Sequence, residues 1–234
     1  MNPTLVLPKG GSIVGVDMRS QDESTLCNLR IIEPVGARTC TNVSIGGTSG
    51  YLYDLWLSNS DTAIFCDNIA GLHARNITSE ACNKSLSICS IKGVYNCAFS
   101  DYLAYDCKIG LFIQESGGLI QNVLFSQCAF LKAHLYDVFV DGGKGICFTG
   151  CNILDGKEGG AYIADGTVSF VNCNFHSSNG YSLRLSEESH VSIVGGQIAP
   201  VDSIVMPSTA TGSFIFRGVL GLSKPGTSSD NDSE

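Results

Sequence analysis

Charged side chains are scarce in this 234-residue chain, since Asp, Glu, Lys and Arg together make up 15% of it. Lys and Arg number 14 against 22 Asp and Glu, which gives a formal net charge of −8, and the basic residues form no run. Nucleic acids and anionic membrane surfaces are bound by clustered Lys and Arg. The composition therefore argues against both of these partners.

Long apolar runs are also lacking. The charge-free segment 203–216 is too short to span a membrane and contains Pro207, Thr209 and Thr211. The opening residues show no basic stretch followed by an apolar one, which is the pattern of a secretory signal. We therefore expect no membrane insertion and no export through a signal peptide.

The sequence also lacks a helical apolar pattern and the cysteine spacing of a metal site. No window of 11 or more residues combines a helical apolar pattern with capping residues. The chain has 11 cysteines but no Cys-x-x-Cys pair, so the spacing is not that of a zinc site. We favour free, buried thiols over disulfides or a bound metal, and we expect no cofactor.

A repeat is the dominant feature that is present. Apolar residues recur at steps of 22 or 23 along a ladder formed by Phe125, Phe148, Phe170, Ile193 and Phe216. Cysteines recur at steps of 31, 23 and 22, at Cys97, Cys128, Cys151 and Cys173, and a second apolar set follows them, at Phe99, Phe130, Ile153, Phe175 and Ile198. Such a period indicates one supersecondary unit stacked on copies of itself.

Each repeat has the same internal pattern. It opens with alternating apolar residues, which indicates a β-strand, and then reaches a residue that tolerates left-handed backbone geometry. These bend positions are Asn96, Gln127, Gly150, Asn172, Gly195 and Gly218. We predict an all-β solenoid of eight to nine coils over residues 1–222, followed by an acidic, disordered tail at 223–234.

These segments resemble a known superfamily. Rungs such as VSFVNCNF and HVSIVGGQI are similar to coils of right-handed single-stranded parallel β-helices, and the opening LPKGGSIVGVDM is similar to the entry coil of pectate-lyase-like members. The resemblance implies that fold but leaves function open, because the superfamily includes polysaccharide lyases, hydrolases, epimerases and bacteriophage tailspikes and fibres. The Asn-Thr-Asp, Asp-Asp, Gly-His-Gly and Arg-Ile-Lys motifs of its galacturonan hydrolases do not occur here.

Four residues are weak catalytic candidates. Asp165 and Glu187 lie about one period apart and could pair as glycosidase carboxylates beside Arg184. A lyase would need a base such as His176 near Tyr181 and Arg184. For all of them we favour the plainer reading, which is that they are solvated residues at turns.

An aromatic patch lies in GYLYDLW (50–56), which contains Tyr51, Tyr53 and the single tryptophan, Trp56. Regular alternation would put Tyr51, Tyr53 and Leu55 on one face and Trp56 on the other. Aromatic side chains stack on sugars and also dominate protein interfaces, so a ligand site, an interface and a partly buried core position all remain open.

We predict a structural or receptor-binding module of a bacteriophage or virus-like particle, such as a fibre, spike, appendage or decoration protein. It would assemble in the host cytoplasm as a homotrimer, contact other virion proteins and bind host-surface polysaccharide. The alternatives are a lyase or glycoside hydrolase acting on a bacterial or acidic polysaccharide, and a bacterial adhesin. We favour a binding role over an enzymatic one.

Overall fold

The structure is a computed structural model, which describes residues 3–8, 12–36, 38–178, 180–200, 203–209 and 211–221. These residues form the strands β1 (Thr4–Val6), β2 (Val14–Met18), β3 (Ser24–Ile32), β4 (Thr41–Ser58), β5 (Thr62–Glu80), β6 (Lys84–Ser90), β7 (Val94–Tyr105), β8 (Ile109–Glu115), β9 (Ile120–Ser126), β10 (Ala129–Leu131), β11 (Tyr136–Asp141), β12 (Lys144–Thr149), β13 (Asn152–Leu154), β14 (Gly159–Asp165), β15 (Thr167–Val171), β16 (Asn174–His176), β17 (Tyr181–Leu185), β18 (His190–Val194), β19 (Gln197–Ala199), β20 (Ile204–Val205) and β21 (Ser213–Arg217). Within this part of the chain, no helix is long and apolar enough to cross a membrane.

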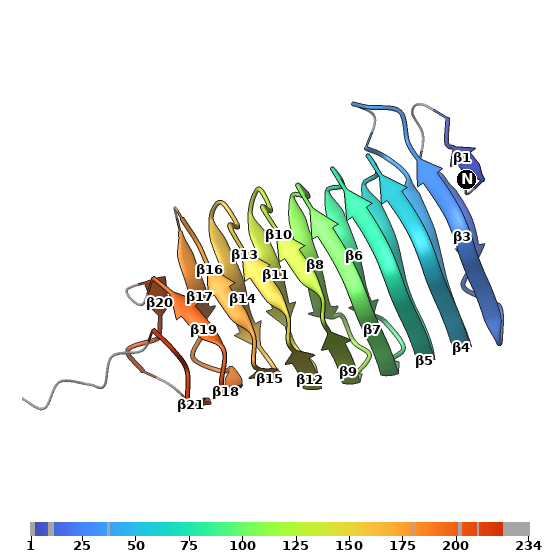
Figure 1. Cartoon of the computed structure of the whole chain (residues 1–234). Coiled ribbons are helices and arrows are strands. Elements are labelled where there is room, and N and C mark those ends of the chain that lie inside the picture. The colour runs from blue at the N-terminus through green and yellow to red at the C-terminus, as the bar shows by residue number, and fades with distance from the viewer. Residues whose placement is uncertain are drawn as a thin grey trace, which may run out of the picture.

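The strands stack in parallel along three sides of a solenoid (Figure 1). Sheet I contains β2, β6, β8, β11, β14, β17 and β20 with the first parts of β4 and β5. Sheet II contains β9, β12, β15, β18 and β21 with parts of β3, β4, β5 and β7. Sheet III contains β1, β10, β13, β16 and β19 with the ends of β3, β4, β5 and β7.

Each coil therefore runs through sheets I, II and III before the next coil begins. About nine turns result, and the fold is a right-handed parallel β-helix, as the sequence predicted. The predicted tail at 223–234 lies outside the described residues, so the domain division stays a prediction.

The predicted apolar ladder fills the interior behind sheet II. Phe125, Phe148 and Phe170 pair in register on consecutive rungs and are fully buried. Their ring centroids are 4.7 and 4.8 Å apart, close to the spacing of neighbouring strands. Ile193 and Phe216 continue the same column, which confirms the ladder.

The predicted bends are also confirmed. All six bend positions have positive φ, with Asn96 at 54°, Gln127 at 54°, Gly150 at 61°, Asn172 at 52°, Gly195 at 67° and Gly218 at 62°. Five of them, from Gln127 onward, form one corner between sheets II and III. Asn and Gly tolerate this geometry with little strain, which explains their recurrence at a sharp turn.

The first members of the cysteine set, the second apolar set and the bend set were placed wrongly. Phe99 pairs with Phe125 and not with Phe130, and Cys97 pairs with Val123 and not with Cys128. In the coils from β3 to β15, left-handed residues occur on both sides of sheet II, and two of these corners have nearly the same sequence, Asn96-Cys97-Ala98-Phe99 and Gln127-Cys128-Ala129-Phe130. Asn96 belongs to the corner before sheet II, where its Oδ1 accepts a hydrogen bond from Asn122 Nδ2 at 3.1 Å.

The buried cysteines stack as free thiols. Cys128, Cys151 and Cys173 lie at the corner that follows sheet II, and each thiol donates a 3.5 Å hydrogen bond to a carbonyl of the preceding coil. Their role is to pack the interior, as the sequence suggested for these positions.

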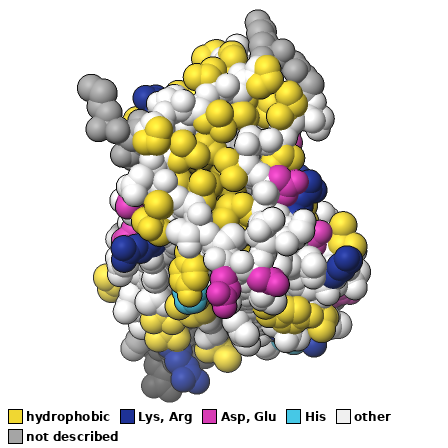
Figure 2. Space-filling model, turned by 90° about the vertical axis from the view of Figure 1, so that its right-hand side faces the viewer, with side chains coloured by type: hydrophobic (Ala, Val, Ile, Leu, Met, Phe, Trp, Pro, Cys, Tyr) yellow, Lys and Arg dark blue, Asp and Glu magenta, His cyan; other side chains and the backbone are white. Residues whose placement is uncertain are grey.

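Figure 2 shows the end of the solenoid at which β1 lies, where hydrophobic side chains gather near the middle of the face. β1 pairs only with β3 in the described part of the chain, and Leu5 and Val6 are exposed by 36% and 63%. A strand edge of this kind presents unpaired backbone groups to any neighbouring chain.

Candidate functional site

One row of side chains runs along the outer face of sheet I. Phe112, Phe139, Tyr162 and Arg184 pair on consecutive rungs of β8, β11, β14 and β17, and we call them the aromatic row. Their strand neighbours point inward and are buried, so alternation along each strand turns these four side chains outward. The three rings are half-buried and Arg184 is exposed.

The rings of the row touch one another and carry cations at both ends. Phe112 and Phe139 stack with centroids 5.3 Å apart, and Phe139 meets Tyr162 edge-on at 5.4 Å. Lys84 Nζ lies 4.4 Å from the Phe112 centroid, and Arg184 Cζ lies 4.8 Å from that of Tyr162. Cations over ring faces are held by cation–π attraction, which fixes the two ends of the row.

Two more tyrosines widen this surface. Tyr136 and Tyr181 lie beside the row, with centroids 6.3 Å apart across the intervening rung. That rung carries Gly159, where an added Cβ would lie only 2.3 Å from the Tyr181 ring. Partial burial raises the pKa of Tyr181, so its phenol stays neutral. The glycine therefore lets an aromatic ring lie flat across the sheet.

Acidic and amide groups line the margin of sheet I next to sheet II. Asp141 pairs with Asp165 on the following rung, at a β-bulge, and with Gln114 on the preceding one. Gln114 Nε2 donates to Asp141 Oδ2 at 3.3 Å. Of the sequence candidates, Asp165 and Arg184 thus lie on the same sheet.

Glu187 and His176 lie elsewhere. Glu187 is in the turn between β17 and β18, and its Oε1 accepts a hydrogen bond from Thr209 at 3.0 Å. His176 ends β16 in sheet III, with Nδ1 2.9 Å from Asp155 Oδ1. Burial raises the pKa of Asp155, but the hydrogen bonds from His176 and Ser178 outweigh it and leave that pKa below its usual value.

Basic residues line the opposite margin, at the corner between sheets III and I. Lys108, His134 and Lys157 are exposed, and their backbone N–H groups bond to successive coils, so the three form a column. Sequence reasoning missed this column because it contains one basic residue per coil, at steps of 26 and 23 residues. A search for basic residues at the repeat period would have found it.

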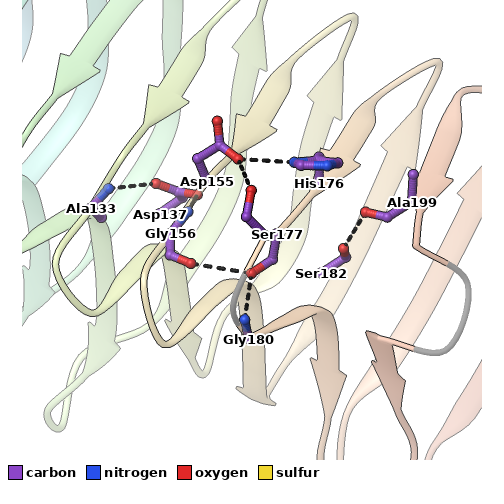
Figure 3. Close-up of polar contacts among 10 residues, drawn as sticks. Ala133, Asp137, Asp155, Gly156, His176, Ser177, Gly180, Ser182 and Ala199 are labelled. Atoms are coloured by element: carbon purple, nitrogen blue, oxygen red, sulfur yellow. Dashed lines mark hydrogen bonds and ion pairs between the residues drawn. The ribbon is translucent and has the colours of Figure 1, made fainter.

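A buried carboxyl supports this corner from inside (Figure 3). Asp137 accepts hydrogen bonds from the backbone N–H groups of Ala133, at 3.0 Å, and Gly156, at 2.7 Å, so it joins the turns of two consecutive coils. Its side chain is fully buried, and burial raises the pKa of Asp137 to about 8. In the next coil, Ser177 Oγ donates to the Gly156 carbonyl at 3.2 Å and extends the network.

The predicted aromatic patch is divided between two sheets. Tyr51 and Tyr53 lie on the outer face of sheet II, whereas Trp56 lies on sheet III with Arg30 Cζ 4.5 Å from its ring. The predicted alternation was wrong from Asp54 onward, because Asp54 has a φ of 56° and breaks it at the corner. As a result Leu55 is buried, and Tyr51 and Trp56 are exposed by 45% and 42%.

No cluster of three or more His, Cys, Asp and Glu that could hold a metal ion occurs in the part of the chain that the structure describes.

Fold and surface together define a class, a single-stranded right-handed parallel β-helix with an aromatic outer sheet. No protein-family model matches the sequence, and no curated protein matches it.

Solved structures with a similar chain path include tailspike protein 3 of bacteriophage CBA120, at 12% identity and a TM-score of 0.36, over 94% of this chain and 46% of that one. Tailspike protein 2 of an Escherichia coli O157:H7 bacteriophage matches at 11% identity and a TM-score of 0.35, over 93% and 38%. An endo-xylogalacturonan hydrolase from Aspergillus tubingensis matches at 13% and 0.33, over 92% and 84%. This chain spans less than half the length of either tailspike, and similarities this distant assign no substrate or activity to it.

Proposed function

We propose that this β-helix is a receptor-binding module of a bacteriophage or virus-like particle and that it binds a host-surface polysaccharide along the outer face of sheet I. The observation that carries the proposal is the aromatic row, flanked by Tyr136 and Tyr181. These rings lie on the outside of the solenoid, so they do not fill its interior and are accessible to a ligand.

The row suits an extended sugar chain. Pyranose rings pack their apolar C–H faces on aromatic side chains, and the neighbouring polar groups then fix their orientation. Rungs of a parallel sheet recur about every 4.8 Å, so the row follows a straight line along the solenoid. The edge-on contact of Phe139 with Tyr162 would break that line into two stacking surfaces.

The two margins would supply the polar contacts. Asp141 and Gln114 can accept and donate hydrogen bonds to sugar hydroxyls on one side, while Lys108 and Lys157 lie along the other, on either side of His134, whose Nε2 lies 3.1 Å from Asp106 Oδ1. A glycan that carries hydroxyls on one edge and negative charge on the other would match both margins.

The proposal that the protein belongs to a bacteriophage or virus-like particle rests on the thiols and on the solenoid. Free buried thiols at Cys128, Cys151 and Cys173 suit a protein that assembles in a reducing cytoplasm. A homotrimer would let apolar outer side chains, such as Ile215 on sheet II, pack between subunits. A solution mass near three times 24.7 kDa would support the trimer, and a monomer would contradict it.

The test is a binding screen against purified bacterial capsular and O-antigen polysaccharides by biolayer interferometry. We expect at least one polysaccharide to bind, and the double variant Phe139→Ala/Tyr162→Ala to weaken its binding at least tenfold. The matched control is Tyr105→Ala, because Tyr105 is also exposed, by 40%, and carries Lys132 over its ring, but lies on sheet III. Unchanged affinity in the double variant would place the glycan elsewhere.

A second candidate function, polysaccharide cleavage, is favoured by one observation. Asp141 and Asp165 are paired across neighbouring rungs beside Tyr162 and Arg184, which is a geometry that could place two carboxylates on one glycosidic bond. Release of reducing ends from a bound polysaccharide, abolished in Asp165→Asn and in Asp141→Asn, would establish this activity. Binding without cleavage would contradict the enzymatic candidate and support the receptor-binding role.

A further inference from the structure

A hollow lies on the outer face of sheet II, on a different side of the solenoid from the aromatic row. Its volume is about 360 Å³, and the residues that line it include Tyr51, Tyr53, His73, Arg75, Ala98 and Ser100. This volume is within the range of small-molecule sites, roughly 300–1,000 Å³.

A change of side-chain size along two columns creates the hollow. In the first column Tyr51 and His73 are followed on the next rung by Ala98. In the second column Tyr53 and Arg75 are followed by Ser100. Two large pairs therefore form a step down to a floor of two small residues.

In the first column, the far side of the floor is closed by a larger residue. Leu124 follows Ala98 in the first column and is exposed by 40%. In the second column Ser100 is followed by Ser126, so the floor is one rung wide beside His73 and continues beyond Ser100.

One wall of the step is aromatic. Tyr51 and His73 stack with centroids 5.6 Å apart and planes only 14° from parallel, so His73 turns its outer ring face toward Ala98 and Tyr51 supports it from behind. Such a surface can pack against a sugar ring or another flat apolar face.

The other wall carries an unneutralised cation. Arg75 is exposed and its Cζ lies 6.0 Å from the Tyr53 centroid, and it forms no ion pair with any acidic side chain among the described residues. A hydrogen bond with Cys27 raises the pKa of Tyr53, so the phenol next to this guanidinium stays neutral. A free guanidinium fork fits a carboxylate or phosphate by paired hydrogen bonds.

We propose that this hollow is a separate binding site for one sugar unit that bears a carboxylate or phosphate. The anion pairs with Arg75, the sugar ring rests on Ala98 against the ring face of His73, and Ser100 hydrogen-bonds a hydroxyl. The site is distinct from the polysaccharide surface on sheet I and does not depend on it.

The test is an isothermal titration of the full chain with N-acetylneuraminic acid, galacturonic acid and glucose 6-phosphate, with neutral galactose as the comparison. We expect at least one acidic sugar to bind at least tenfold more tightly than galactose. Binding of a carboxylate or of the phosphate supports the site and identifies its anion, whereas no binding of any acidic sugar, or equal binding of galactose, overturns it.

Two variants locate the ligand. Arg75→Gln is expected to weaken binding at least tenfold, and Ala98→Leu to abolish it by filling the floor. Leucine is tolerated in this column, as Leu124 shows on the next rung, so the second variant should fold. Thermal unfolding of each variant checks that it does.

Arg217→Gln is the matched control, because Arg217 occupies the same column as Arg75 at the other end of sheet II and is also exposed. An equal loss in Arg217→Gln would mean that binding reflects general charge, and the site would be rejected. The sheet I variant Phe139→Ala/Tyr162→Ala should leave monosaccharide binding intact, which separates this site from the proposed polysaccharide surface.

Discussion

Phenylalanine rings stack along this solenoid in two places, inside it at Phe125, Phe148 and Phe170 and on the outer face of sheet I at Phe112 and Phe139. The spacings are similar, with centroids 4.7 and 4.8 Å apart inside and 5.3 Å apart outside. The inner rings are fully buried, whereas the outer rings keep one side open to solvent. Stacking distance is thus set by the rungs, and the side of the strand decides whether a ring stabilises the fold or can bind a ligand.

Removing one inner ring is the strongest test of this contrast. We expect Phe148→Ala to lower the free energy of unfolding by about 3–5 kcal/mol, because it leaves a cavity between two stacked neighbours. Its outward counterpart, Phe139→Ala, should cost less than about 1.5 kcal/mol, since the site is open on one side. Denaturant unfolding measures both, and equal losses would contradict the assignment of inner and outer columns.

The aromatic surface on sheet I can be disturbed through a backbone position. Gly159→Ala should cost about 1–3 kcal/mol, because the added methyl overlaps the Tyr181 ring and must displace it. The double variant Gly159→Ala/Tyr181→Ala removes the overlap, so the alanine at 159 should cost much less in that background. A double-mutant cycle without coupling would show that the ring does not lie over this glycine.

The buried Asp137 predicts a pH dependence of stability that no exposed carboxylate on sheet I would share. Its folded pKa of about 8 exceeds the value of 3.8 expected when exposed, so between these pH values the folded protein keeps a proton that the unfolded chain releases. Stability should therefore fall as pH rises from about 4 to 8, by up to about 1.4 kcal/mol per pH unit.

Asp137→Asn removes the titrating group, so its unfolding free energy should vary less over that range. Chemical unfolding at pH 5 and pH 7.5 measures the difference. Asp141→Asn, at a half-buried position four residues along the same strand, is the control. A wild-type protein as stable at pH 7.5 as at pH 5 would mean that Asp137 is ionised in the folded state.

The smallest expected difference in stability is between serine substitutions at two cysteines that lie four residues apart. Cys151 is buried, so Cys151→Ser places a hydroxyl in the interior and should cost about 1–2 kcal/mol. Cys147 points outward in a column that already holds Ser169 and Ser192, so Cys147→Ser should be within about 0.5 kcal/mol of neutral. A thiol reagent should label Cys147 in the folded protein and leave Cys151 unmodified. Labelling of Cys151 but not Cys147 would contradict the assignment of Cys147 to the outer face and Cys151 to the interior.

Much of the architecture could be predicted because the interior repeats. Phe125, Phe148 and Phe170 occur at the coil period since each must fill the same space on successive rungs. The error at Asn96 has a local cause, because Asn96-Cys97-Ala98-Phe99 and Gln127-Cys128-Ala129-Phe130 read alike but turn at different corners of the coil. Residue pattern alone does not distinguish two left-handed corners on either side of one sheet.

The candidate sites could be predicted only in fragments. Tyr51 and Tyr53 are recognisable in the sequence as part of an aromatic cluster. Arg75 and Ala98 lie on later rungs and become their neighbours only through stacking. Likewise Asp165 and Arg184 were singled out, while the rings of Phe112 and Phe139 were overlooked, because half-buried aromatic residues resemble core residues in a β-rich sequence.

The sequence by itself determined the solenoid, its period and its inward columns, because burial imposes the same demand on every coil and so leaves a repeating pattern. Only the tertiary structure decided which outward residues meet. Side chains on neighbouring rungs are more than twenty residues apart in the chain, and one left-handed residue at a corner, such as Asp54, moves the next aromatic onto another face. The aromatic row and the hollow on sheet II are products of that stacking.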